Sequence, residues 1–383
     1  MAATSAWQRA LRAFAALLPG RRTANATQLA GLVGGMLASG GAQAVTLPED
    51  RAEAMIHAYD GGGVRATGPA LLVRKSLADR VTLSGTYYVD MVSNASIDVV
   101  TTASPFKETR SEFGLGLDYA YRDSLVTLSA TSSSEPDYKS DSVSLDVSQE
   151  VFGGMTAVSL GFTRGSDKVG QAGTPGFFDS AKHWKYRLGV TQIVTPTWLM
   201  SANLEAISDD GYLGSPYRVA RVFGAAVPER VPRTRSSRAV KLRSISEVVP
   251  GTALRAEYRY FWDNWDIRAH TAEIGATRHL GDAWLGEGFL RVHKQKGALF
   301  YSDNAASETT YVSRNRQLSD FNNFSVGTQL SYLYARVPGK YEIRADVSYE
   351  FVRFKFSEFT DIRNGQLYSH DANVMQLYVS ATF

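Results

Sequence analysis

The sequence predicts an all-β protein: a transmembrane antiparallel up-and-down β-barrel that follows a cleaved signal peptide. Three observations support this fold class. The first residues carry arginine but no acidic residue, apolar and polar residues alternate over long segments, and the chain ends in an aromatic residue, Phe383. Alternation with a period of two is typical of strands that have one apolar and one wet face.

Residues 1–44 are predicted to be the signal peptide, and residues 45–383 the barrel domain. The first segment has four arginines, then an apolar run from Leu29 to Ala38, then the small-x-small pattern of Ala42-Gln43-Ala44. This is the order of charge, apolar stretch and cleavage site in an export signal. A soluble helix is the alternative, while a membrane anchor would need about 20 apolar residues. The predicted location is therefore the bacterial outer membrane.

Charge and composition exclude several functions. Without the four arginines of the signal, 37 Lys and Arg face 38 Asp and Glu, so the mature chain has a net charge near −1. No nucleic-acid partner follows from such a balance. There is no cysteine, which excludes disulfides, thiolate metal sites and cysteine nucleophiles. No sequence feature points to a cofactor.

Turn signals between the alternating segments predict sixteen strands. Short connections occur at 76–80, 122–124, 153–154, 195–197, 250–251, 281–282 and 337–339, and longer ones at 60–63, 93–106, 134–138, 165–180, 209–236, 263–266, 298–320 and 357–370. Seven tight turns and eight loops join sixteen strands, with short turns in the periplasm and long loops outside. Fourteen strands is the alternative, because the first hairpin, 52–59 with 64–74, is weakly patterned.

The predicted strands have roughly 10–14 residues, longer than the usual 5–6 of soluble strands, and carry aromatics at their ends. Trp198, Trp284 and the Tyr260–Trp262 pair are such ends, as in an interfacial girdle. A soluble β-sandwich, which also alternates, is the alternative. In the last strand, Met375, Leu377, Val379, Ala381 and Phe383 share one face. That ending resembles substrates of the outer-membrane assembly machinery, so the expected partners are that machinery, outer-membrane lipid and lipopolysaccharide, with the barrel as a monomer.

The polar face of each strand should line the lumen. Acidic residues dominate the first third of the chain, and most cations lie between Lys185 and Arg259, so we expect an acidic wall opposite a more basic wall. The lumen candidates in the cationic stretch are Arg187, Arg243, Arg255, Glu257 and Arg259. Two interpretations stay open: a transverse field across a water-filled pore, or charges that satisfy one another in a plugged lumen. The long 209–236 connection could fold inward as a constriction, or could be a solvated loop that touches lipopolysaccharide.

Several segments resemble the bacterial outer-membrane family catalogued as domain of unknown function 3570. They are 89–100 with 103–105 and 108–110, then Ser134–Ser140, Pro232–Ser236 and Tyr258–Thr271. The resemblance covers nearly all of 50–383. It implies a barrel of unsettled role whose members often occur beside a flavin transferase, a thioredoxin-like protein and a small lipoprotein. It supplies no catalytic residue.

The matching segments nevertheless provide lumen or rim candidates: Asp90, Ser93, Ser96, Asp98, Glu108, Arg110, Asp137, Arg233, Arg235, Asp263 and His270. The alternative is that these residues only tie long loops to the rim. The six histidines are scattered over separate segments, with His270 and His293 as the best lumen-side pair for a metal, and no metal site is predicted.

Three functions follow from these observations. The favoured one is a passive or gated channel for a small solute. The second is a closed-lumen scaffold or binding barrel that serves a periplasmic redox or metal-handling module, with a periplasmic lipoprotein or redox protein as partner. The third and weakest is an outer-membrane hydrolase. No GxSxG elbow and no HExxH motif is present, so the chain is not expected to be an enzyme.

Overall fold

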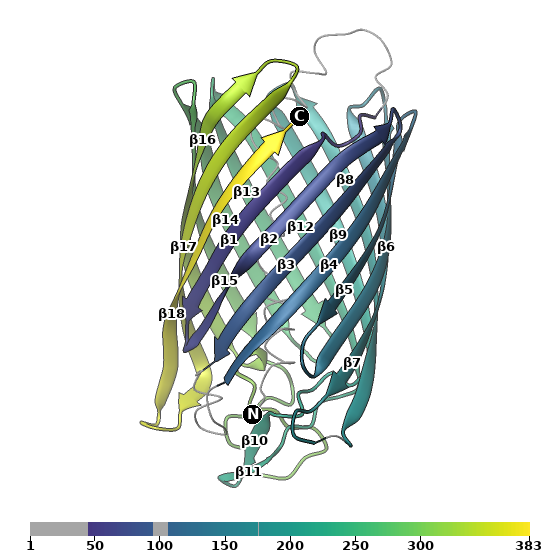
Figure 1. Cartoon of the computed structure of the whole chain (residues 1–383). Coiled ribbons are helices and arrows are strands. Elements are labelled where there is room, and N and C mark those ends of the chain that lie inside the picture. Colours follow the sequence, from purple (N-terminus) through teal and green to yellow (C-terminus); the bar gives the residue numbers. More distant parts are fainter. Residues whose placement is uncertain (1–44, 95–105, 175) are drawn as a thin grey trace.

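The alternating segments form long antiparallel strands that close into one barrel of sixteen strands (Figure 1). A computed structural model describes residues 45–94, 106–174 and 176–383. The predicted signal peptide, 1–44, therefore lies outside the described residues. The barrel strands are β1 (Arg51–Gly61), β2 (Val64–Ala78), β3 (Val81–Asn94), β4 (Phe106–Tyr121), β5 (Ser124–Ser134), β6 (Tyr138–Val151), β7 (Thr156–Gly170), β8 (Phe178–Thr195), β9 (Trp198–Gly211), β12 (Thr234–Val249), β13 (Thr252–Asp263), β14 (Arg268–Leu280), β15 (Trp284–Lys296), β16 (Phe321–Val337), β17 (Tyr341–Asp361) and β18 (Gln366–Thr382).

The first and last strands close the barrel. Every strand pairs with its neighbours in the chain, except that β12 follows β9 and that β1 pairs with β18. Along this seam Arg51 lies opposite Thr382, and Gly61 lies opposite Ala372. The amide of Phe383 donates to the carbonyl of Asp50 at 3.1 Å. The predicted count of sixteen strands is confirmed. The weakly patterned first hairpin is also present, as β1 and β2.

The apolar face of the strands points outward, as predicted for a wall in contact with lipid. On β18 the side chains of Met375, Leu377 and Val379 are 52%, 51% and 47% exposed. The intervening polar residues, such as Ser380, are buried on the inner side. Because side chains alternate across a strand, one register decides the direction of every side chain on that strand.

The two ends of the barrel differ. At one end, short turns connect the strands, and both Val45 and Phe383 are hydrogen-bonded there. Gly281 and Gly339 supply the positive φ values of 79° and 69° that two of these turns need. At the other end lie the long connections, including a small hairpin, β10 (Val219–Val222) with β11 (Ala225–Pro228) (Figure 1). We call these the turn end and the loop end.

Four connections differ from the prediction. The 165–180 loop is shorter than predicted, because β7 continues to Gly170 and β8 begins at Phe178. The 60–63 connection is a two-residue turn at Gly62–Gly63. The predicted 357–370 loop is mostly strand, because β17 continues to Asp361 after an irregularity between Lys355 and Thr360, and β18 resumes at Gln366. The 209–236 connection contains the β10–β11 hairpin, which no alternation had indicated. A further element, the 3-10 helix η1 (Arg316–Leu318), lies in the connection between β15 and β16. None of the described helical segments has the length and apolar character to span a membrane.

Candidate functional site

Ion pairs cover the inner face of β8, β9, β12 and β13. Lys185 Nζ lies 2.5 Å from the Glu205 carboxylate, which also lies 3.8 Å from the Arg259 guanidinium. Lys241 and Arg243, on β12, each lie 2.6 Å from Glu257 on β13. These side chains come together because odd-numbered residues of all four strands face inward at matching registers.

Arg255 continues this network toward β17. Its guanidinium lies 2.7 Å from Glu273, 3.0 Å from Glu287 and 3.7 Å from Glu257. Glu273 also accepts a hydrogen bond from Arg291 Nε at 2.7 Å, and Arg291 Nη1 donates to Glu350 at 2.9 Å. The cations of the expected basic wall are interleaved with carboxylates on the adjacent strands, so many of its charges are paired locally.

Inward glycines allow polar pairs to form across an intervening strand. Arg187 on β8 donates two hydrogen bonds to Asp146 on β6, at 2.7 and 2.9 Å, by passing over Gly161 of β7. Gly161 is the register partner of both residues. A side chain at Gly161 would collide with both the Asp146 carboxylate and the Arg187 guanidinium.

A second polar cluster lies on β1, β3 and β4. The His57 ring stacks on Tyr88 with ring centres 4.8 Å apart, and its Nε2 lies 2.7 Å from the Asp90 carboxylate. It reaches across β2, where its register partner is Gly68. Arg110 on β4 lies 3.7 Å from Asp90, donates to Ser133 Oγ at 2.9 Å, and is hydrogen-bonded to Glu112.

The structure thus brings together two of the predicted candidates, Asp90 and Arg110, while Glu108 faces inward on the same strand, β4. Sequence reasoning missed His57, Tyr88 and Ser133. Their inward position follows from strand parity, but their contact depends on the barrel register.

Three connections fold together over the loop end, and we call this assembly the plug: residues 212–233, 264–267 and 297–320. The hairpin residue Val222 bridges to Ala305, and Arg230 pairs with Val312 through two backbone hydrogen bonds of 3.0 and 2.8 Å. Trp265, Ile267, Ala298 and Leu318 form a buried apolar cluster between these segments. The plug therefore has a core of its own.

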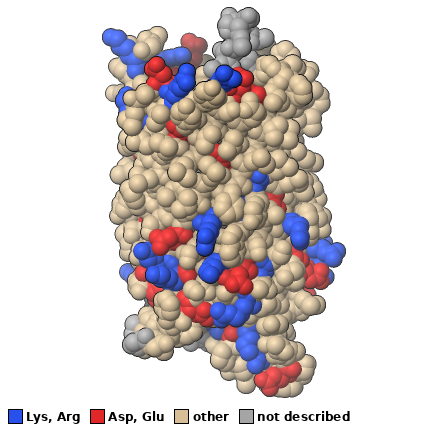
Figure 2. Space-filling view, turned by 90° about the vertical axis from the view of Figure 1, so that its right-hand side faces the viewer, with Lys and Arg blue, Asp and Glu red and all other residues tan. Residues whose placement is uncertain are grey.

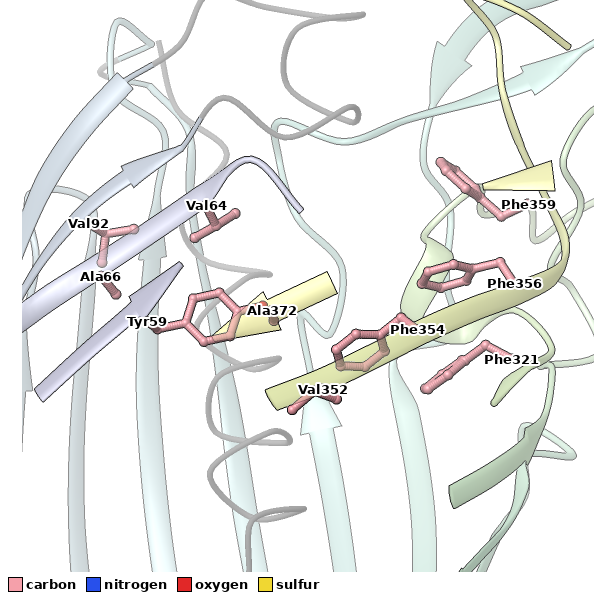
Figure 3. Packing of buried hydrophobic residues seen from close by; sticks show 10 residues of the cluster. All are labelled: Tyr59, Val64, Ala66, Val92, Phe321, Val352, Phe354, Phe356, Phe359 and Ala372. Carbon is pink, nitrogen blue, oxygen red and sulfur yellow. The ribbon is translucent and has the colours of Figure 1, made fainter. Parts of the chain in front are cut away.

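Next to the plug, an apolar patch lines the inner wall near the loop end. It comprises Tyr59, Val64, Ala66, Val92, Phe321, Val352, Phe354, Phe356, Phe359 and Ala372 (Figure 3). Arg314 of the plug lies over the Phe359 ring at 4.3 Å and donates to the carbonyl of Thr360 at 2.6 Å. Arg316 lies over Tyr368 at 5.6 Å. Two arginines therefore connect the plug to this wall.

The rim candidates connect loops to strands. Arg235 lies 2.6 Å from Asp263 and over the Trp265 ring at 4.6 Å, and Asp263 also accepts from the amides of Trp265 and Ile267. Arg233 forms two hydrogen bonds of 2.8 Å with Asp179.

Asp137, another rim candidate, accepts a hydrogen bond from the Tyr217 hydroxyl. Burial and this bond raise the pKa of Tyr217. The arginines of the 209–236 segment named here are thus paired, which agrees with the interpretation that such residues tie loops to the rim.

Two further candidates, His270 and Ser93, do not line the lumen. His270 occupies an even position of β14, so its exposed ring lies on the outer face, where Nδ1 is 2.7 Å from the Tyr258 hydroxyl. The proposed lumen pair of His270 and His293 is therefore wrong, since His293 faces inward. Ser93 also faces outward at the rim. Ser96 and Asp98 lie outside the described residues. In the described ranges, no group of three or more histidine and acidic side chains could hold a metal ion.

Comparisons with known proteins agree with this fold. The family model described as "Protein of unknown function (DUF3570)" matches residues 39–177 and 171–353. No curated protein matches the chain. Among solved structures, a bacterial polysaccharide outer membrane secretin is similar at a TM-score of 0.51 and 8% identity, over 88% of this chain and 99% of that one.

Two further solved structures are similar at lower scores. OpdK of Pseudomonas aeruginosa, solved with vanillate, has a TM-score of 0.45 and 9% identity, over 87% of this chain and 98% of that one. The siderophore receptor PirA of the same organism has a TM-score of 0.43 and 12% identity, over 82% of this chain. The chain spans 60% of the length of PirA. At these identities the likeness concerns the fold, which is that of bacterial outer-membrane proteins.

Proposed function

Because the chain belongs to the family described as protein of unknown function (DUF3570), whose description assigns no activity, we propose its role from geometry. The protein is a gated channel that lets a small polar solute cross the bacterial outer membrane, to which the predicted signal peptide directs it.

The carrying observation is a charged inner wall that remains in contact with water beneath a separate plug. The side chains of Asp146, Arg187 and Lys185 face inward, yet 42%, 34% and 32% of their surface is exposed. A wall of alternating charges in water suits a path for polar solutes and excludes apolar ones. The plug closes the loop end through its own cluster and a few polar contacts, which is what a gate requires.

Conductance across planar bilayers tests this proposal. We expect discrete current steps for the wild-type barrel, and more frequent steps for a variant in which 219–228 is replaced by a short Gly-Ser linker. Tryptophan fluorescence checks that the variant is folded. If the bilayer stays sealed with both folded proteins, the channel proposal is wrong.

The pairing of the inner charges favours one alternative, a closed-lumen scaffold for a periplasmic redox partner. Arg255 is held by three carboxylates, and such networks also satisfy charges in a lumen that carries no solute. This alternative predicts a sealed bilayer together with recovery of a small lipoprotein or flavoprotein after gentle extraction and crosslinking. If neither protein is recovered, this alternative loses its basis.

A further inference from the structure

Four cations gather on the outer face of β6, β7 and β8 near the loop end: Lys139, Arg164, Lys168 and Lys182. All four side chains are exposed and point away from the lumen. Figure 2 shows this side of the barrel, where a broad, mostly uncharged band separates the charged residues near the turn end from those near the loop end. We call these four residues the outer basic patch.

The outer basic patch is only partly neutralised by the protein itself. Lys139 and Lys168 are direct cross-strand partners, an arrangement of like charges that destabilises a sheet unless an anion compensates. Lys139 lies 3.6 Å from Asp141, and Lys182 is the register partner of Asp210 on β9. Within the described part of the chain, Arg164, Lys168 and Lys182 form no ion pair. Four cations thus face two carboxylates, which leaves excess positive charge that a ligand could neutralise.

Side-chain type changes regularly from this patch toward the middle of the barrel. On β7, Arg164 is followed on the outer face by Phe162 and then Leu160. On β8, Lys182 is followed by Trp184, Tyr186 and Leu188. The Phe162 and Tyr186 rings lie 5.3 Å apart. Cation, then aromatic, then aliphatic is the order in which a membrane changes from headgroup to interface to acyl chain.

The patch therefore lies at headgroup depth in the leaflet on the loop-end side. Long loops face the outside in barrels of this type, and short turns face the periplasm. Lysine and arginine side chains are the usual binding groups for phosphate. An outer-leaflet lipid with phosphates on its headgroup and several acyl chains would match both the charges and the apolar surface beneath them.

We propose that the outer basic patch binds the phosphorylated headgroup of lipopolysaccharide, with acyl chains packed along Leu160 and Leu188. The inference requires the proposed outer-membrane location but not the channel activity. A barrel that conducts nothing would carry the same lipid site, so the two proposals fail independently.

The test is a titration of the barrel, purified from outer membranes in detergent, with lipopolysaccharide at low ionic strength, followed by native mass spectrometry. The triple variant Arg164→Gln, Lys168→Gln, Lys182→Gln should bind about 100-fold more weakly, since each cation near an anionic lipid surface contributes about a fivefold factor. The difference should shrink as salt is added. If the triple variant does not fold, Lys168→Gln alone should weaken binding about fivefold.

The matched control removes three exposed cations at the turn end: Arg80→Gln, Arg336→Gln, Lys340→Gln. This variant loses the same charge as the triple variant of the outer basic patch, the patch variant, but keeps the outer basic patch intact. We therefore expect its affinity for lipopolysaccharide to be unchanged. Equal weakening by both variants would mean that net charge, not a site, attracts the lipid, and would overturn the proposal. Unchanged binding by the patch variant would also overturn the proposal. The wild-type barrel should bind dephosphorylated lipopolysaccharide as weakly as the patch variant binds intact lipopolysaccharide. If the wild-type barrel binds phosphatidylglycerol micelles as tightly as lipopolysaccharide, the choice of lipid is wrong.

Discussion

Arg314 joins the plug to the end of β17, so its removal should open the gate of the proposed channel. Its Nη2 donates to the carbonyl of Thr360, at the end of β17, at 2.6 Å, and lies 2.8 Å from the Asp303 carboxylate. Its Nε donates to the Asp303 carbonyl at 3.0 Å. The guanidinium also covers the Phe359 ring, and only 7% of the side chain is exposed.

The substitution Arg314→Ala removes the hydrogen bond to the Thr360 carbonyl and the contact with the Phe359 ring, which both join the plug to β17. The pair with Asp303 lies within the plug, so its loss affects the closed and the displaced plug alike. A hydrogen bond from a charged donor contributes about 1.5–3 kcal/mol and a cation–π contact about 0.5–1 kcal/mol, so we take the sum of the lower limits, about 2 kcal/mol. That energy would shift the ratio of closed to displaced plug by about 30-fold.

Single-channel recording measures this shift as open probability. Arg363→Ala is the control, because Arg363 also lies near the end of β17 and pairs with Asp361 at 2.6 Å, but it is 59% exposed. An exposed pair contributes about 0–1 kcal/mol, so this variant should open no more often than wild type. Unchanged open probability in folded Arg314→Ala protein, or an equal rise in the Arg363→Ala control, would refute the assignment of Arg314 as the gate latch.

Three other substitutions test the wall and the seam. Arg255→Met leaves three carboxylates without their shared cation and should lower the free energy of unfolding by about 3 kcal/mol in urea titrations followed by tryptophan fluorescence; no loss would mean that the network is not energetically coupled. Leu145→Lys places a charge on the lipid face at the middle of β6 and should cost about 2–4 kcal/mol in lipid vesicles, whereas Ser144→Lys, on the inner face, should cost clearly less. Asp50, bonded to Lys75 at 2.6 Å and to the Ser76 amide, has its pKa lowered from 3.8 to about 2. Its contribution to stability is therefore fully present above pH 3.8 and lost as pH falls through 2, so the melting temperatures of wild type and Asp50→Asn should converge over that range.

Strand existence and strand faces could be predicted from this sequence, because a period of two is local information. The outward position of Leu377 and Val379 follows from the residues of β18 alone. The count of sixteen followed from turn signals, of which Gly281 and Gly339 are examples. Lipid contact makes the pattern unusually clear, since each outward position must be apolar wherever the wall meets acyl chains.

Contacts between strands could not be predicted in the same way. The pair of His57 and Asp90 depends on the β1–β2–β3 register, which the periodicity does not record. The predicted lumen position of His270 is wrong because His270 is three residues from the inward-facing Glu273, and an odd separation on a strand puts two side chains on opposite faces. The plug was missed because its core, around Trp265 and Leu318, forms between segments far apart in the chain.

The wall and the plug are held by similar polar contacts, yet they should respond differently to stress. Wall pairs such as Arg187 with Asp146 join strands that are already linked through continuous backbone hydrogen bonds to the strand between them. Separating such a pair would require the barrel to deform. The plug meets β17 mainly through Arg314 and Asp303, which contact Thr360 near the strand end. If the barrel is the channel that we propose, we therefore expect it to open by movement of the plug on a rigid wall.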